Sequence, residues 1–203
     1  ACARQQRGVG ADLEVVALSS GIKVQLALEG QLITVKKLAK PRIADGKVVS
    51  DVAADILKMM VMNRYSAAAP AIDFVSGFGL TRGAIASTVA HDSHNIIAVG
   101  ADDESMTRAV NLLVESKGGI SFVDGEKEWL LPLPVAGLMS DKDGYEVARL
   151  YSSINAEVTG SGSALAAPFM TLSFMALLVI PALKLSDKGL FDGTTFSFTT
   201  LFE

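Results

Sequence analysis

Short runs of apolar residues, separated by glycine and serine, dominate the N-terminal part of the chain. Residues 12–18 and 22–28 are two such runs, and the second alternates apolar with polar side chains, as a half-buried strand does. A third run, residues 32–38, follows Gly30. The pattern predicts a short β-rich segment over residues 1–38, which we expect to continue a preceding domain.

The spacing of apolar residues then changes from helical to strand-like. Apolar side chains recur at helical intervals over residues 51–64, and Asp51 is suited to cap the first turn, so a helix is predicted there. Short apolar runs predict three strands after it, over residues 74–78, 83–89 and 96–99. The second of these runs is apolar enough for a strand that is covered on both faces.

The second half of the chain alternates helices and strands. Acidic residues open a predicted helix over residues 102–115, where their charge stabilises the positive end of the helix dipole. Residues 120–131 are typical of a hairpin that turns at Asp124, and Asp143 is suited to cap a further helix. Because the hairpin interrupts a purely parallel pattern, residues 39–203 are predicted to form an α/β domain, a mixed β-sheet layered with α-helices.

One segment is apolar enough to raise the question of a membrane span. Residues 164–183 contain no charged residue before Lys184, and roughly 20 apolar residues are enough to cross a bilayer. Pro168 and Pro181 bracket the run, however, and leave about 12 uninterrupted residues, the length of a buried core helix. We therefore predict a buried helix and no membrane span, and the N-terminus shows no pattern of a secretory signal peptide.

Composition narrows the class of protein. The net charge is −4, with both signs scattered along the chain, which gives no support to nucleic-acid binding. Half of the residues are hydrophobic and 20% are charged, as in a globular chain. The single cysteine, Cys2, excludes an internal disulfide framework and a cysteine-built zinc site. A reducing, cytoplasmic environment is the natural expectation.

Both histidines of the chain lie in one five-residue stretch between two predicted strands, His91-Asp92-Ser93-His94-Asn95. Imidazole titrates near neutral pH and also binds metals, and loops at the ends of strands commonly carry functional side chains. A His-x-x-His pair alone is a weak metal signal, because a zinc or manganese site needs further ligands. Two interpretations stay open: the rings face a substrate, or they hydrogen-bond locally and fix the turn.

Arg82 is the other candidate for ligand binding. It lies between Gly79 and Gly83, where backbone without side chains lets a guanidinium reach a carboxylate or a phosphate. A solvated arginine in a turn is the alternative. The neighbouring glycines lack the Lys-Ser/Thr of a phosphate-binding P-loop and miss the dinucleotide-binding spacing by one residue, so nucleotide binding is not predicted.

Four blocks of sequence carry a resemblance to a known family. Residues 77–95 are the glycine-rich run that ends in the histidines, residues 131–141 read LPLPVAGLMSD, residues 168–174 read PFMTLSF, and residues 181–190 follow them. In this order, and over residues 45–203, the blocks resemble the C-terminal domain of adenine deaminase, a member of the amidohydrolase superfamily.

The resemblance implies a function. Adenine deaminase hydrolyses adenine to hypoxanthine and ammonia, in purine salvage and adenine catabolism, and its metal-binding barrel holds dinuclear manganese or iron. That barrel is missing here, so we expect this chain alone to be inactive and to act with its barrel domain as a cover that shapes the purine pocket. Adenine and a homo-oligomer are the other implied partners. The alternative is a non-catalytic structural or interaction domain.

The candidate site residues all come from the histidine stretch and from Arg82. We expect no metal ligand and no cofactor site in this chain. The catalytic candidates are His91, Asp92 and His94, and the substrate-binding candidates are Ser93, Asn95 and Arg82.

Overall fold

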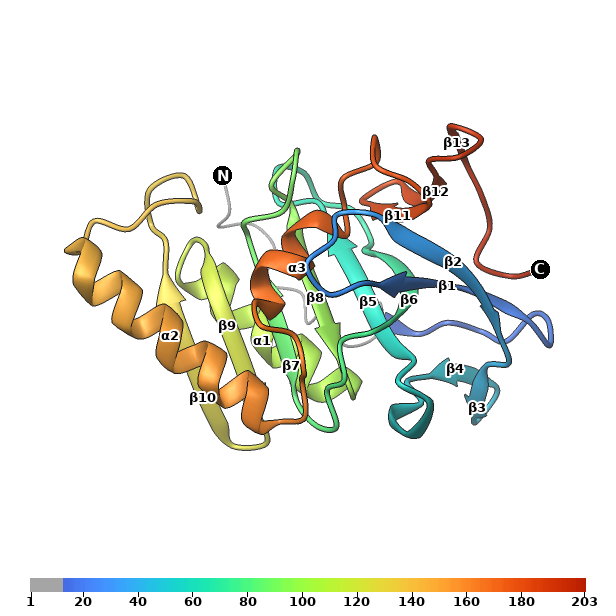
Figure 1. The fold of residues 1–203 in the computed structure, drawn as a ribbon, viewed down its shortest axis with the longest axis horizontal. Helices are drawn as coiled ribbons and strands as arrows, with labels where there is room; N and C mark the ends of the chain where they lie inside the picture. Colours follow the sequence, from blue (N-terminus) through green and yellow to red (C-terminus); the bar gives the residue numbers. More distant parts are fainter. Residues whose placement is uncertain (1–12) are drawn as a thin grey trace.

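An eight-stranded sheet forms the centre of the computed structural model, which describes residues 13–203 (Figure 1). The strands of this sheet are β1 Ile22–Ala27, β2 Thr34–Ala39, β5 Leu57–Met62, β6 Ala71–Ser76, β7 Ala84–Ser87, β8 Ile96–Gly100, β9 Gly119–Asp124 and β10 Lys127–Pro132. They lie in the order β10-β9-β7-β8-β5-β6-β1-β2, and the pair of β1 and β6 is parallel while the other pairs are antiparallel. The sheet is therefore mixed, which confirms the predicted fold class.

Helices and small sheets cover both faces of this sheet (Figure 1). The remaining elements are α1 Asp103–Glu115, α2 Gly144–Gly160, α3 Pro168–Phe174, the sheet of β11 Leu183–Ser186, β12 Gly189–Asp192 and β13 Ser197–Phe198, and the hairpin of β3 Arg42–Ala44 and β4 Lys47–Val49. One core cluster joins α1 to one face, and a second joins α2, α3 and β11 to the other. This layering leaves β7 and β8 covered on both faces.

The predicted helix starts and the predicted hairpin are confirmed. Asp102 caps α1 by accepting a hydrogen bond from the backbone N–H of Ser105 at 2.7 Å, and Asp143 caps α2 through the N–H of Tyr145 at 2.9 Å. Each cap satisfies a backbone donor that the helix itself leaves free. β9 and β10 pair directly across the turn that follows Asp124.

The predicted helix over residues 51–64 is wrong. A single 3₁₀ turn, Val52–Ala54, follows Asp51, and the segment then becomes β5, in which every residue is buried. β5 lies in the middle of the sheet, and its side chains alternate between the two core clusters: Leu57 faces one and Met60 the other. A continuous apolar run has no clear period, so spacing alone does not separate a buried strand from a helix.

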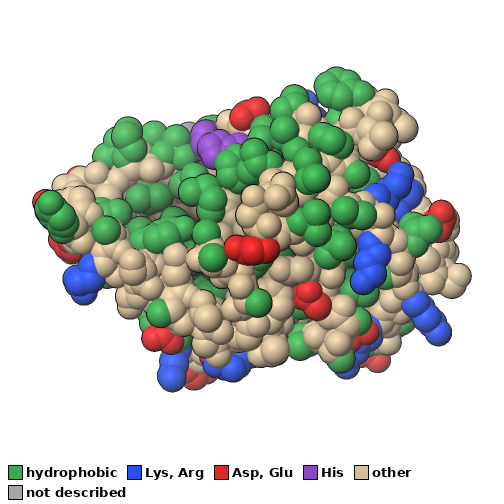
Figure 2. Space-filling model, in the orientation of Figure 1, with side chains coloured by type: hydrophobic (Ala, Val, Ile, Leu, Met, Phe, Trp, Pro, Cys, Tyr) green, Lys and Arg blue, Asp and Glu red, His purple; other side chains and the backbone are tan. Residues whose placement is uncertain are grey.

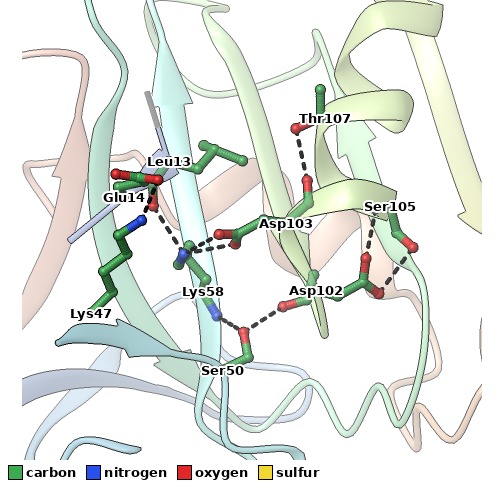
Figure 3. A network of polar contacts seen from close by, with 10 residues as sticks. Leu13, Glu14, Lys47, Ser50, Lys58, Asp102, Asp103, Ser105 and Thr107 are labelled. Atoms are coloured by element: carbon green, nitrogen blue, oxygen red, sulfur yellow. Dashed lines mark hydrogen bonds and ion pairs between the residues drawn. The ribbon is translucent and has the colours of Figure 1, made fainter. Parts of the chain in front are cut away.

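Lys58 is the charged residue that made the sequence of β5 unlike that of a buried strand. It is only 1% exposed, and its ammonium donates to both carboxylate oxygens of Asp103 at 2.7 Å and to the carbonyl of Leu13 at 2.9 Å (Figure 3). A buried charge needs such partners because its desolvation is costly. The pair therefore ties β5 to the first turn of α1 and to the start of the described chain.

The apolar segment after residue 163 holds a shorter helix than predicted. α3 ends at Phe174 because neighbouring groups take the carbonyls of its last turn: the N–H of His91 donates to Ser173 O at 2.9 Å, and the ammonium of Lys184 donates to Phe174 O at 3.0 Å. Such tertiary partners replace the hydrogen bonds of a longer helix. Within residues 13–203 no helix is long and apolar enough to cross a membrane.

The N-terminal segment joins the main sheet. β1 and β2 confirm two of the three predicted strands, whereas residues 13–18 contribute a single bridge between Val16 and Lys47 in place of the third. Cys2 and the signal-peptide assignment lie outside the described residues. That residues 1–38 continue a preceding domain stays a prediction.

Candidate functional site

The histidine stretch forms a tight turn between β7 and β8, at one end of two strands that are buried over their whole length. The backbone N–H of His94 donates to the carbonyl of Ala90 at 2.7 Å, and the N–H of His91 donates to α3 through Ser173. His94 has a φ of 51°, a left-handed conformation that few non-glycine residues adopt. Both ends of the turn are thus held, which fixes where the two rings lie.

The two imidazole rings lie against one another and against α3. The ring of His91 stacks on Phe174 with centroids 4.8 Å apart, and it meets the ring of His94 edge-on at 5.5 Å. The Nδ1 atom of His94 is buried and has no hydrogen-bond partner within residues 13–203. A buried, unsatisfied ring nitrogen is costly, so this atom calls for a partner that the described residues do not supply.

The pKa of His94 is lowered from its usual value of 6.5. Burial is the largest cause, and electrostatic interactions with His91 and Arg64 add to it, while Asp92 acts in the opposite direction. The ring of His94 is therefore neutral at neutral pH. A neutral imidazole has one donor and one acceptor nitrogen and can take up a proton during a reaction.

Residues that follow β5 support the turn. The backbone N–H of Arg64 donates to the buried carboxamide oxygen of Asn95 at 3.3 Å, and the hydroxyl of Tyr65 donates to the carbonyl of Ser93 at 2.9 Å. The guanidinium of Arg64 donates to the carbonyl of Ala136 at 2.8 Å. Its Nε atom is buried and unpartnered in the described chain, so one donor here lacks a partner, as does the ring nitrogen of His94.

A carboxylate from the C-terminal part of the chain completes the site. Asp187 lies in the turn between β11 and β12, and its Oδ2 atom accepts a hydrogen bond from the carboxamide of Asn63 at 2.8 Å. Asn63 itself directly follows β5. The contact brings together two residues that are 124 positions apart.

A pocket of about 250 Å³ opens between these elements. Its polar lining is His91, Asp92, Ser93, Asn95, Ser186 and Asp187, and its apolar lining is Val61, Ala90, Ala176, Leu178 and Val179. Four of the six predicted site residues therefore line one cavity, and His94 lies directly behind His91. An apolar cavity with a few convergent polar groups is the usual form of a small-molecule site.

Arg82 lies away from this pocket. It precedes β7, whereas the histidine turn follows that strand. Its guanidinium forms an ion pair with Asp124 at 2.7 Å and donates to the carbonyl of Gly160 at 3.0 Å. The structure therefore places this substrate-binding candidate at the opposite end of β7 from the other five.

The described residues offer no metal centre. Within residues 13–203, no three His, Cys, Asp or Glu side chains come close enough together to hold a metal ion. Asp102 and Asp103, the acids nearest to the histidines in sequence after Asp92, serve α1 and Lys58 instead. A metal-dependent reaction would take its metal ligands from elsewhere.

Sequence reasoning missed Asn63, Arg64, Tyr65 and Asp187. The first three form a polar triplet directly after the apolar run of β5, and the wrong helix assignment hid the fact that a strand ends there. Polar residues that follow buried strands are a recognised sign of a site. Asp187 lies in an ordinary turn, and no local signal marks it.

Comparison with known proteins identifies the family. The family model of the adenine deaminase C-terminal domain matches residues 31–197, a range that contains the whole lining of the pocket. This chain belongs to that family. The predicted resemblance is confirmed, and it extends further toward the N-terminus than the four blocks indicated.

Curated relatives of the chain agree with the family. The chain is 54% identical to the adenine deaminase of Methanosarcina barkeri over 181 residues, which cover 89% of the chain and 33% of the relative. It is 50% identical to the adenine deaminase of Salinibacter ruber over 194 residues, 95% of the chain and 35% of the relative. The chain therefore spans about a third of the length of the curated relatives it matches.

Proposed function

We propose that this chain acts as the C-terminal domain of an adenine deaminase, which converts adenine and water to hypoxanthine and ammonia. In this proposal the domain covers the active site of a preceding barrel domain and shapes the purine pocket. One observation carries it: four of the six predicted site residues line a single cavity in a chain of this family. The names of the relatives support the substrate.

The surface around the pocket supports a covering role. Five large apolar side chains are exposed near the histidine turn, namely Tyr65, Val135, Met139, Met170 and Val179. We call this set the apolar rim. Figure 2 shows the histidines at the surface with hydrophobic side chains beside them. Clustered exposed apolar groups of this kind commonly mark a surface that another domain covers.

Four of the five members of the apolar rim, all except Met170, are linked to the site by a contact. Tyr65 donates to the backbone of Ser93, and Val179 lines the pocket itself. Val135 and Met139 flank the short loop that accepts the guanidinium of Arg64. These members of the rim therefore lie beside the polar turn, as part of an interface next to an active-site entrance would.

The chemistry divides between the two domains. A dinuclear manganese or iron centre in the barrel would activate the attacking water, and none of the described residues of this chain forms a metal centre. The neutral ring of His94, which packs against the ring of His91, is suited to position that ring or to exchange a proton near it. His91, held by α3 and Phe174, is suited to contact the purine directly.

The test is a chimaera in which this chain replaces the matching third of the Methanosarcina barkeri relative. We expect the chimaera, supplied with manganese, to release ammonia from adenine, and the 203-residue chain alone to release none above background. Turnover by the isolated chain, or a folded but inactive chimaera, would contradict the proposal. The second result would favour a domain that serves packing or interaction only.

The proposal also covers the cellular compartment, the pathway and the oligomeric state of the enzyme. We expect the enzyme to act in the cytoplasm, in purine salvage or adenine catabolism, and to assemble as a homo-oligomer. Sedimentation of the active chimaera, compared with that of the unmodified relative, measures whether this chain supports the same oligomeric state.

A further inference from the structure

The proposed function leaves one pocket residue without a role. Asp187 lines the cavity together with the histidine turn, and one oxygen of its carboxylate accepts a hydrogen bond from Asn63 at 2.8 Å. We propose that the Asp187 carboxylate accepts a hydrogen bond from the imidazole-ring N–H of the purine and so selects the free base over 9-substituted purines. The inference rests on the proposed function of the pocket.

Asn63 holds this carboxylate in one orientation. Its Oδ1 atom accepts hydrogen bonds from the backbone N–H groups of Tyr65 at 2.8 Å and Ser66 at 2.9 Å. The carbonyl end of the amide is thereby fixed on the backbone, so the NH₂ end must point at Asp187. The amide occupies Oδ2, and the Asp187 carboxylate accepts no second hydrogen bond within residues 13–203.

The size and lining of the cavity fit a single heterocycle. Its volume of about 250 Å³ lies below the ~300–1,000 Å³ that is usual for drug-sized ligands. Leu178 and Val179 contribute apolar side chains to the same lining. We expect a flat base to pack against these side chains with its edges toward His91 and Asp187, so that a substituent at nitrogen 9 would meet the Asp187 carboxylate.

The division of the chemistry decides which edge of the base reaches Asp187. In the proposed function the reaction takes place at carbon 6, on the side of the barrel, so this domain receives the remote edge of the ring. Free adenine carries an N–H on its imidazole ring, and a carboxylate is the strongest side-chain acceptor for it. Substitution at nitrogen 9 removes that donor and adds bulk at the same place.

The experiment compares adenine with 9-methyladenine in the active chimaera. We expect the unmodified chimaera to have a KM for adenine at least about tenfold below the inhibition constant of 9-methyladenine, because a site built to hydrogen-bond a group discriminates strongly against its absence. Asp187→Asn should raise KM at least about tenfold with kcat within about threefold, since a remote contact contributes equally to ground and transition states. In Asp187→Asn, the ratio of the inhibition constant of 9-methyladenine to the KM for adenine should fall toward one.

Lys188→Gln is the matched control, because Lys188 is exposed in the same turn and its replacement also removes one charge. It should leave KM and the discrimination unchanged. An active chimaera that binds 9-methyladenine as well as adenine overturns the inference, and this result needs no variant to fold. Unchanged discrimination in Asp187→Asn also overturns it, whereas an inactive unmodified chimaera refutes the proposed function instead.

Discussion

The two ends of β7 differ in how fully their polar groups are used. At the Arg82 end, the guanidinium is bound to Asp124 and to a backbone carbonyl, and the hydroxyl of Thr81 donates to Ser161 O at 2.7 Å. At the histidine end, Nδ1 of His94 and Nε of Arg64 are buried without a partner in residues 13–203. β7 therefore connects an end whose polar side chains are hydrogen-bonded to an end where two buried polar atoms have no partner among the described residues.

This difference separates a structural cluster from a site. Both ends look alike in sequence, since each combines small residues with one or two cationic side chains. Buried polar groups are normally satisfied, so leftover donors and acceptors in a native chain require an explanation. In the proposed function, a ligand group bound in the cavity beside the histidine end would supply this explanation, whereas the polar groups at the Arg82 end already have partners.

The largest effect is expected from His94→Asn in the chimaera. Asparagine adopts the left-handed backbone of this position at little cost, and the His94 side chain donates no hydrogen bond that the change would break within the described chain. Turnover of adenine should fall roughly tenfold or more, the usual loss for a proton-handling group. Steady-state kinetics and a melting curve on the same preparation measure both effects.

The structural interpretation of the turn makes the reverse prediction for the same variant. If the rings only fix the turn, the loss of the ring contact with His91 should lower the free energy of unfolding by about 0.5–1.5 kcal/mol while turnover per folded molecule stays near normal. Normal kinetics with a clear loss of stability would therefore end the functional interpretation of the histidine end.

Most of the fold was predictable from the sequence because local signals set it. The caps of α1 and α2 are side chains that bind the backbone two or three residues away, and the turn after Asp124 joins adjacent strands. β5 was not predictable in this way, because its character depends on burial between two layers and on Lys58 meeting Asp103, 45 positions later.

The candidate site likewise combines residues that the sequence marks locally with residues that only the fold brings together. The histidine turn was visible because its residues are contiguous, and five of the six candidates lie in that turn. Asn63 and Asp187 come together only through the order of strands in the sheets, and nothing local marks Asp187. Arg82 shows the opposite case, since its flanking glycines suggested a ligand while its partner, Asp124, was 42 positions away.

A pair of glycine substitutions sharpens the comparison at a smaller scale. Gly137 has a φ of 74°, and an alanine Cβ at this position would lie 2.0 Å from Nη1 of Arg64. Gly125 has a φ of 58°, and an alanine Cβ there would have no atom within 4 Å. Gly137→Ala should therefore displace Arg64 and lower turnover severalfold. Gly125→Ala, next to Asp124, should show only the backbone strain of about 1–2 kcal/mol with unchanged turnover.

These two variants share the left-handed strain, so their difference isolates the Arg64 contact. Chemical denaturation gives the strain and adenine kinetics give the functional loss. Equal kinetics in the two variants would show that the position of Arg64 does not matter to the histidine end.

A smaller effect is expected from pH. The pKa of His94 is lowered in the folded chain. As the pH falls through 6.5, the unfolded chain therefore binds a proton at His94 before the folded chain does. The free energy of unfolding should thus decrease below that pH. Arg64→Gln removes one cause of the lowered pKa, so the pKa should rise toward 6.5 and this loss should weaken. The chain has only two histidines, so NMR titration of their ring protons resolves both.

The smallest effect is expected from Arg82→Ala. The ion pair with Asp124 is largely exposed on the arginine side, at 56%, and exposed pairs contribute about 0–1 kcal/mol to stability. The free energy of unfolding should therefore fall by less than about 1 kcal/mol, and kcat/KM for adenine in the chimaera should stay within about twofold because the group is already saturated by Asp124 and Gly160. Asp124→Ala is the matched variant: it frees the guanidinium without removing it. If Arg82→Ala alone lowered kcat/KM tenfold while Asp124→Ala did not, Arg82 would contact substrate, and a closed hydrogen-bond network would no longer distinguish the structural end of β7 from the functional one.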